Sequence, residues 1–257
     1  MQTSYRCYVV SLAREPQKSA EFLERNRATG LPFTVFPAVD GSALTLEDCV
    51  ERGLIAADAI GYSRGTIGAG GSHSTLWKEA DATGSNLLIF EDDAYCRHDI
   101  ARQIDELLSG LPDWDLIFLG YNTDAVLDIR MSEHFNFAGF FSNPAPSHGQ
   151  LQAFANETGR VVAVRLNNAF GLCSYLISPH GARKLISLFP MDNRRVRIPG
   201  NMASLGRDTF RCMTVDMITN TLYPSMSAYA AIPPLAIPLN HRTSSTTMRG
   251  PPPRRPD

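Results

Sequence analysis

Short apolar strands alternate with helical segments through the first 120 residues, and this alternation limits the possible folds more than any other feature. Residues 5–12 are rich in Tyr and Val, a helix starting near Pro16 runs to about residue 28, and residues 33–39 form a second strand. Strand, helix and strand at this spacing predict a right-handed parallel crossover. We therefore expect an α/β fold with a mainly parallel central sheet flanked by helices.

A second crossover follows the first. A glycine-rich loop, 61–71, leads to a helix that Ser72 is placed to cap, and apolar strands occupy 86–90 and 115–119 on either side of a further helix. Residues 121–160 carry scattered Gly, Asn, Pro and Ser, with only weak strand signals. A stretch of this kind usually shapes a binding site or is partly disordered.

Charge and composition exclude several classes of protein. The chain has 24 basic and 26 acidic residues, a formal net charge of −2, which argues against binding nucleic acid through a general basic field. No apolar run approaches the roughly 18–20 residues that a membrane-spanning helix needs. The five cysteines include no Cys-x-x-Cys pair, which argues against a zinc site or a disulfide framework. We expect a cytoplasmic protein with at most peripheral contact at the inner face of the membrane.

Three consecutive carboxylates, Glu91, Asp92 and Asp93, directly follow an apolar strand. Ligands of open α/β sheets bind outside the carboxyl ends of the strands. Alternate residues of an extended chain point the same way, so we expect Glu91 and Asp93 to share one face. Two hard oxygen ligands there could hold Mg²⁺ or Mn²⁺ and leave sites open for substrate phosphates. The alternative is a solvated acidic turn before a helix.

Ser72 and His73 are predicted to lie in the first turn of the helix that precedes the acidic strand. Free backbone N–H groups at a helix start favour anions, which makes both residues candidate anion contacts. Trp77 lies four residues beyond His73 and shares its face of the helix. The alternative is a Ser cap, a packed Trp and a His satisfied in the core.

Several short runs, spread over residues 5–185 in a fixed order, form a recognisable signature. They are YVVSLAR (8–14), FPAVDG (36–41), Ile67-Gly68, Ser72-His73 with Trp77, IFEDDA (89–94), WDLIFLG (114–120) and SYLIS (174–178) with Gly181-Ala182. This ordered set resembles glycosyltransferase family 25. That family includes bacterial lipooligosaccharide galactosyltransferases and the catalytic modules of collagen galactosyltransferases.

The resemblance implies a GT-A-like fold and an inverting, metal-dependent transfer of a hexose, most often galactose, from a UDP-sugar. It implies that Mn²⁺ or Mg²⁺ and the donor diphosphate bind at the acidic triplet, a DxD-like motif, with Glu91 and Asp93 on the metal and Asp92 beside the ribose or the donor sugar. Matching positions that would line the nucleoside pocket are Ser11, Leu12, Arg14 and Asp40. By their place at the predicted helix start, Ser72 and His73 would lie beside the donor phosphates or sugar.

The resemblance, with the composition of the last residues, divides the chain by role. A single domain over 1–241 would have a nucleotide-sugar-binding half, 1–120, and an elaborated acceptor-side half, 121–241, before a flexible Arg- and Pro-rich tail, 242–257. The acceptor would be a glycan, a lipid-linked glycan or a protein or peptide hydroxyl, and lipopolysaccharide biosynthesis is one setting for such a reaction. His241, at the start of the tail, is a candidate metal ligand, and its alternative is a solvent-exposed His.

Inverting transfer also needs a general base on the acceptor side of the sugar. Asp216 is our candidate, because it follows Met213-Thr214-Val215, opens a short helix and has few charged neighbours in sequence. The alternative is a helix cap. Asp192 is the second candidate, although Arg194 and Arg195 nearby favour ion pairing there.

Two other functions compete with transfer. One is a catalytically inactive domain that binds a sugar nucleotide or a glycan. The other is a nucleotidyltransferase or phosphotransferase, against which the absence of a G-x-x-x-x-G-K-[ST] motif argues.

Overall fold

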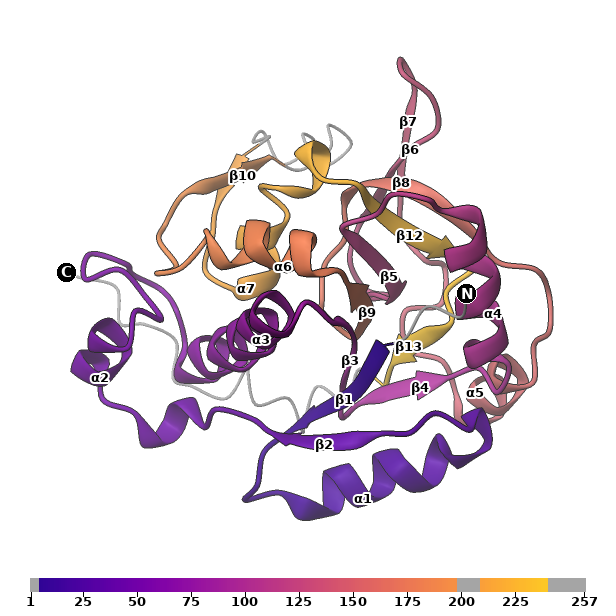
Figure 1. The fold of residues 1–257 in the computed structure, drawn as a ribbon, viewed down its shortest axis with the longest axis horizontal. Coiled ribbons are helices and arrows are strands. Elements are labelled where there is room, and N and C mark those ends of the chain that lie inside the picture. Colours follow the sequence, from indigo (N-terminus) through magenta and orange to yellow (C-terminus); the bar gives the residue numbers. More distant parts are fainter. Residues whose placement is uncertain (1–4, 198–208, 240–257) are drawn as a thin grey trace.

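The computed structural model describes residues 5–197 and 209–239, which form a large mixed sheet with helices on both faces (Figure 1). The strands are β1 (Tyr5–Ser11), β2 (Thr34–Pro37), β3 (Asn86–Glu91), β4 (Ala94–Cys96), β5 (Leu116–Gly120), β6 (Leu127–Arg130), β7 (Asn136–Gly139), β8 (Val162–Asn168), β9 (Ser174–Ile177), β10 (Arg195–Arg197), β11 (Thr209–Arg211), β12 (Ala228–Ile232) and β13 (Ala236–Pro238). The helices are α1 (Pro16–Arg25), α2 (Leu46–Glu51), α3 (Arg64–Thr83), α4 (Ile100–Gly110), α5 (His148–Ala155), α6 (Pro179–Ile186) and α7 (Val215–Thr219).

The strand order confirms the predicted α/β class and adds a feature that the sequence pattern does not contain. Strands β2, β1 and β3 are parallel neighbours, as the first crossover predicts. Strand β9 then lies antiparallel between β3 and β5, so the second crossover joins two parallel strands that are one strand apart. The order along the sheet is β2-β1-β3-β9-β5-β12-β8-β6-β7.

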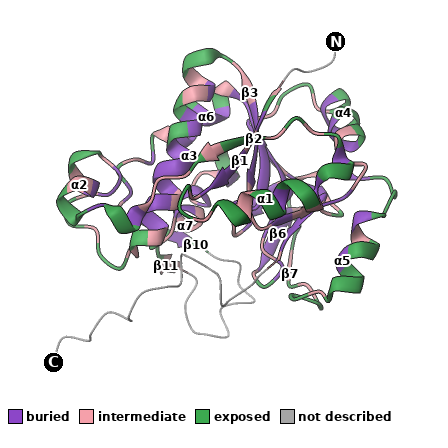
Figure 2. Cartoon of the chain, turned by 90° about the horizontal axis from the view of Figure 1, so that it is seen from below, coloured by how far each residue is buried: buried purple, intermediate pink, exposed green. Residues whose placement is uncertain are grey.

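Two apolar cores lie on opposite faces of this sheet. Strand β3 contributes Leu87 and Ile89 to one core and Leu88 and Phe90 to the other, as the alternation of a strand requires. Helices α3 and α6 cover the first face, and α1 and α4 cover the second. Figure 2 shows the buried residues along the strands and on the inner sides of these helices.

The glycine-rich stretch, expected as a loop, is part of helix α3, and that expectation is therefore wrong. The helix begins at Arg64, where Ser63 caps it by accepting a hydrogen bond from the Thr66 N–H. Glycine has poor helix propensity, which is why the stretch resembles a loop. The packing explains it: a Cβ on Gly68 would lie 2.5 Å from the Val39 carbonyl oxygen, so only glycine lets the helix approach the chain after β2.

Gly68→Ala is accordingly expected to lower the free energy of unfolding by about 2 kcal/mol, because the added methyl group meets backbone atoms that cannot move aside independently. Chemical denaturation measures the difference. The matched control is Gly110→Ala, near the end of α4, where a Cβ meets nothing within 4 Å. That variant should keep or slightly raise stability, since alanine is the better helix former. Equal losses in both variants would contradict the close-approach explanation.

The region 121–160 is more regular than its sequence indicates. It contains the β6–β7 hairpin, which stands away from the body in Figure 1, and the helix α5, which was not expected. Strand β7 lies within the stretch 135–141, where weak strand signals were seen. The hairpin and the residues that follow it carry exposed large apolar side chains, Met131, Phe135, Phe137 and Phe140.

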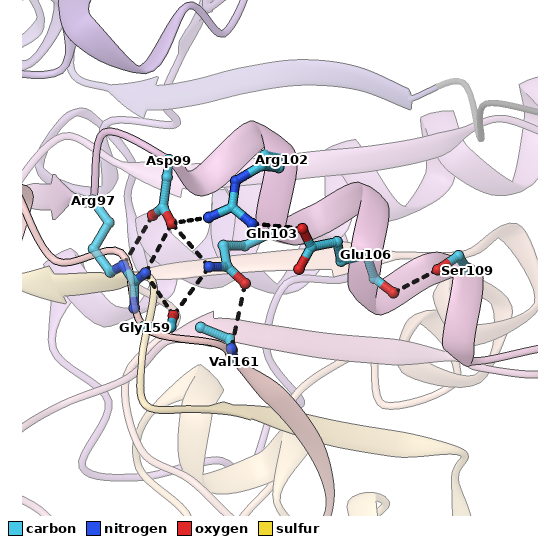
Figure 3. Close-up of polar contacts among 8 residues, drawn as sticks. All are labelled: Arg97, Asp99, Arg102, Gln103, Glu106, Ser109, Gly159 and Val161. Atoms are coloured by element: carbon cyan, nitrogen blue, oxygen red, sulfur yellow. Dashed lines mark hydrogen bonds and ion pairs between the residues drawn. The ribbon is translucent and has the colours of Figure 1, made fainter.

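A buried arginine fastens the start of α4 to the chain before β8 (Figure 3). The Arg97 guanidinium donates to both carboxylate oxygens of Asp99, at 3.0 and 2.9 Å, and to the Gly159 carbonyl at 2.9 Å. Gln103 donates to the same carboxylate and the same carbonyl. Burial alone would raise the pKa of Asp99, but the hydrogen bonds from Arg97 and Gln103, with the nearby positive charges, lower it.

Asp99→Asn is expected to cost about 3 kcal/mol of folding free energy, because it leaves the fully buried Arg97 charge without its partner. Because the pKa of Asp99 is depressed in the folded state, its contribution is complete at neutral pH and is lost as the pH falls below about 4. Urea unfolding of wild type and variant, at neutral pH and below about pH 4, measures the difference in the free energy of unfolding. The control is Glu106→Gln, which breaks only the exposed ion pair with Arg102 and should leave the free energy of unfolding almost unchanged. A cost for Asp99→Asn no larger than this control would contradict the network's role.

Two further findings concern the described residues. None of their helices combines the length and the apolar character that crossing a membrane requires. All five cysteines are buried free thiols.

Candidate active site

The acidic triplet lies where three parallel strands end together. Strand β3 ends at Glu91, residues 92 and 93 form a turn, and β4 begins at Ala94. Val10 of β1 pairs with Glu91, and β2 runs parallel to β1 on its other side. The carboxyl ends of β1, β2 and β3 therefore bring the predicted donor-binding residues to one edge of the sheet.

Ser11 and Asp92, both predicted to lie beside the donor, contact each other. The Ser11 hydroxyl donates to Asp92 Oδ2 at 2.7 Å. Burial raises the pKa of Asp92, and the hydrogen bond from Ser11 offsets part of that rise. This pair joins the end of β1 to the acidic turn.

Arg14 and Asp40 form a second pair across the ends of β1 and β2. The Arg14 Nε–H donates to Asp40 Oδ2 at 2.5 Å, and Asp40 also accepts from the Ser42 hydroxyl and backbone N–H. The hydrogen bonds from Ser42 and then from Arg14 lower the pKa of Asp40, which keeps it ionised. Leu12 lies in the turn after β1, where its carbonyl accepts from the Glu15 N–H. The predicted nucleoside-side residues are thus neighbours.

Asp93 is the most strongly perturbed carboxyl of the turn. Burial raises its pKa well above the usual value, and the charges of Glu91 and Asp92 raise it further. Arg25, at the end of α1, opposes this only in part, since its guanidinium donates to the carbonyls of Asp92 and Ala94. Asp93 Oδ1 is buried and finds no hydrogen-bond partner among the described residues. A buried polar oxygen without a partner is costly, and a bound cation would satisfy it.

The turn changes one prediction. Glu91 and Asp93 were expected on one face, but the extended strand stops at Glu91, so alternation does not continue to Asp93. Within residues 5–197 and 209–239, no three His, Cys, Asp or Glu side chains form a ready metal cluster. Mg²⁺-like cations bound with a substrate phosphate use only one or two protein carboxylates. Hard oxygen donors and the orphaned Asp93 oxygen therefore suit such a cation.

Ser72 and His73 do not lie at a helix start, because α3 begins eight residues before Ser72. The argument that placed them on an anion is therefore wrong. Ser72 is buried, and its hydroxyl donates to the Gly68 carbonyl and accepts from the Val39 N–H, which ties the helix to the chain after β2. His73 is also buried, yet it does reach the triplet: its Nε2 lies 3.3 Å from Glu91 Oε1.

Asp216 opens helix α7, as predicted. Its carboxylate accepts from the Gly171 N–H at 2.9 Å, from the Met217 N–H at 3.0 Å and from the Thr214 hydroxyl. Two residues after Gly171, the Cys173 carbonyl accepts from the Glu91 N–H. Because two residues span at most about 7 Å, Asp216 is anchored near the same edge as the triplet.

Asp192 and His241 are the remaining predicted positions. Asp192 forms a two-point ion pair with Arg194, at 2.8 and 2.9 Å, and hydrogen bonding from Arg194 lowers the pKa of Asp192. This is the ion pairing that the neighbouring arginines favour. His241 falls outside the residues that the structure describes.

Two residues of the site were not singled out from the sequence. Arg25 is the last residue of α1, a helix that carries other basic and acidic residues, and nothing local marks it. Tyr175 lies within a matched run, but its hydroxyl becomes informative only when β9 is placed beside β3, where Tyr175 pairs with Ile89. Both residues can be recognised only from tertiary contacts.

Comparison with known proteins identifies the family of the chain. Residues 5–197 match the family model described as glycosyltransferase family 25 (LPS biosynthesis protein). The chain is 26% identical over 254 residues to the mouse (Mus musculus) protein named inactive glycosyltransferase 25 family member 3, covering 91% of this chain and 37% of the relative. It is 28% identical over 197 residues to a glycosyltransferase 25 family member of Aedes aegypti, covering 72% of this chain and 28% of the relative.

The match therefore covers only 37% of the length of the mouse relative and 28% of the length of the Aedes aegypti relative. The matched region nevertheless includes the acidic turn, the ends of β1 and β2, and helix α3. By this match, which extends over most of its length, the chain belongs to glycosyltransferase family 25.

Proposed function

We propose that the chain is an inverting hexosyltransferase that moves a hexose, with galactose as the first candidate, from a UDP-sugar to an acceptor hydroxyl with the help of Mn²⁺ or Mg²⁺. The observation that carries the proposal is Asp93, a buried carboxyl with an unsatisfied oxygen in an acidic turn at the carboxyl end of β3. Such a group is costly to the fold alone and useful beside a cation and a diphosphate.

The donor half of the site follows from the pairs at the strand ends. Asp93 and Glu91 would hold the cation, which when bound supplies a Lewis acid that stabilises the departing diphosphate oxygen. Asp92, oriented by Ser11, faces the ribose or the donor sugar in this proposal. Arg14 and Asp40 hold each other at the nucleoside end.

Asp216 is the proposed general base. The proposed role is supported by its anchorage to Gly171 beside the edge where the triplet lies. Asp216 would take the proton of the acceptor hydroxyl as that oxygen attacks the anomeric carbon from the side opposite the diphosphate. Asp192 is the less favoured candidate, because Arg194 neutralises it and lowers its pKa.

A second candidate function is binding of a sugar nucleotide or glycan without catalysis. The mouse and rat relatives carry "inactive" in their names, and they match over 91% of this chain. The intact acidic turn, together with the matched runs on either side of it, favours catalysis here. A nucleotidyltransferase has no comparable support.

The acceptor and the setting are further parts of the proposal. A glycan, a lipid-linked glycan or a protein or peptide hydroxyl would fit the chemistry, and the family description, LPS biosynthesis protein, favours the lipid-linked glycan. We place the reaction in the cytoplasm, at most peripherally in contact with the inner face of the membrane. The near-neutral charge favours small anionic donors over nucleic acid as partners.

A screen of UDP-sugars for UDP release tests the proposed function without knowledge of the acceptor, since many transferases slowly hydrolyse their donor. We expect release with Mn²⁺ from one UDP-hexose above all others, and loss of release with EDTA. Binding of UDP with no turnover of any UDP-sugar would favour the inactive binding domain. Release that is indifferent to EDTA would contradict the cation's role.

A further inference from the structure

A chain of three hydrogen bonds runs from the apolar core to the first carboxylate of the triplet. Trp77 Nε1 lies 2.9 Å from the Tyr175 hydroxyl oxygen, and that oxygen lies 2.7 Å from His73 Nδ1. On the other side of the imidazole, His73 Nε2 lies 3.3 Å from Glu91 Oε1. Trp77, Tyr175 and His73 are 0–1% exposed, whereas the Glu91 side chain is 35% exposed. Of these four hydrogen-bonded residues, Glu91 is thus the one whose side chain reaches solvent.

The donor count fixes the direction of each bond. An indole N–H can only donate, so the Tyr175 oxygen accepts from Trp77. Burial raises the pKa of Tyr175 well above its ordinary value, so the phenol keeps its proton. Among the residues that the structure describes, the partners of that hydroxyl are Trp77 and His73, so it donates to His73 Nδ1. Nδ1 then carries no proton, and Nε2 carries the proton that is donated to Glu91.

The opposite arrangement is costlier. If His73 Nδ1 donated to Tyr175, the hydroxyl oxygen would accept twice and its own proton would be buried without a partner, at a cost of about 1–3 kcal/mol. A neutral imidazole would then also turn the lone pair of Nε2 toward the Glu91 carboxylate. Trp77, a donor only, therefore selects the His73 tautomer from two residues away along the hydrogen-bond chain.

The relay stands on rigid elements. His73 and Trp77 lie four residues apart on α3, so they share the face that packs on the sheet. Tyr175 on β9 pairs with Ile89 on β3, two residues before Glu91, so Tyr175 and Glu91 point to the face that α3 covers. The Phe189 ring packs edge-on against Trp77. Neither α3 nor the strands β3 and β9 can shift locally without disrupting the apolar core around them.

We propose that Trp77, Tyr175 and His73 form a positioning relay that holds the Glu91 carboxylate in one orientation, with one oxygen bound to His73 and the other left for the cation and the donor diphosphate. This inference rests on the proposed function for the cation itself. None of the three residues is placed on the substrate. Partners that orient a ligand in this way commonly change metal affinity by ten- to a hundredfold when they are removed.

The test uses variants that remove one atom or one bond at a time. Tyr175→Phe deletes only the hydroxyl, and Mn²⁺ affinity in the presence of UDP is expected to fall about tenfold or more. His73→Asn, too short to reach Glu91, should do the same, whereas His73→Gln returns an N–H donor near Nε2 and should recover part of the affinity. Tyr121→Phe is the matched control. Its hydroxyl is equally buried but donates to the Ala231 carbonyl, and its affinity should stay within twofold of wild type.

A second readout is independent of the cation. Nitrogen-15 NMR of histidine-labelled, metal-free protein should show His73, assigned by its loss in His73→Asn, as the neutral tautomer protonated at Nε2. Tyr175→Phe should change that ratio. A wild-type His73 protonated at Nδ1 would overturn the relay whatever the enzyme does.

The outcomes separate the two proposals. If wild-type protein binds Mn²⁺ with UDP and Tyr175→Phe binds it equally well while remaining folded, the relay is wrong and the proposed function stands. If wild-type protein binds no Mn²⁺ with UDP, the proposed function fails and the positioning role fails with it. Equal losses in Tyr175→Phe and Tyr121→Phe would assign the effect to stability, which also overturns the relay.

Discussion

Asp93→Asn is expected to lower sugar transfer, or UDP release in its place, by at least about a thousandfold. The amide cannot supply an anionic ligand, and losing several kcal/mol of charge stabilisation at the leaving diphosphate corresponds to a loss of that size. The fold should survive, because the orphaned Asp93 oxygen makes no hydrogen bond with any described residue that the substitution could break. Initial rates with saturating Mn²⁺ measure the first effect, and thermal unfolding measures the second.

The control for this variant is Asp113→Asn. Asp113 is exposed and lies just before β5 begins, at the edge of the sheet opposite the acidic turn. Its rate should equal that of wild type. Near-wild-type transfer by Asp93→Asn, or equal losses in both variants, would remove Asp93 from the site.

Asp216→Asn is expected to lower kcat at least about a hundredfold, the usual scale for the loss of a general base, with the donor KM little changed. The structure adds a competing cause, since the same carboxylate holds the Gly171 N–H and could act only by fixing that loop. Steady-state kinetics on Thr214→Ala separates the two. That substitution removes a hydroxyl that donates to Asp216 and caps α7, but leaves the carboxylate in place.

If Asp216 is the general base, Asp216→Asn should lower kcat strongly and Thr214→Ala should lower it only slightly. Thr214→Ala should also cost about 1 kcal/mol of folding free energy, because it removes the cap of α7. Similar losses of kcat in both variants would indicate that Asp216 acts by fixing the loop at Gly171 and not as a base. Normal transfer by Asp216→Asn would eliminate it altogether, and Asp192→Asn would be the next variant to measure.

The first crossover and the acidic turn could be predicted from sequence because their signals are local. A buried strand followed directly by three carboxylates places Glu91, Asp92 and Asp93 at a strand end in any α/β sheet. The pairing of Ser11 with Asp92 follows from β1 and β3 being parallel neighbours. Such contacts are fixed once the strand order is known.

The parts that could not be predicted depend on tertiary contacts. Glycines 68, 70 and 71 lower local helix propensity, yet α3 runs through them because Gly68 lets it lie against the chain after β2 and a Cβ on Gly70 would meet Met191. His73 was assigned to the site for a reason that proved wrong, since it reaches Glu91 from the middle of that helix. Strand β9 contains no signal of its antiparallel insertion between β3 and β5, so the role of Tyr175 was invisible in the sequence.

The most direct test of a cation–diphosphate site at the acidic turn is to locate the cation. Crystals grown with Mn²⁺ and UDP, measured at an X-ray wavelength where manganese scatters anomalously, would show it independently of any assay. The site described here predicts one strong anomalous peak in contact with a carboxylate of Glu91 or Asp93, absent from crystals of Asp93→Asn. A peak elsewhere in the protein, or bound UDP with no peak beside the turn, would contradict it.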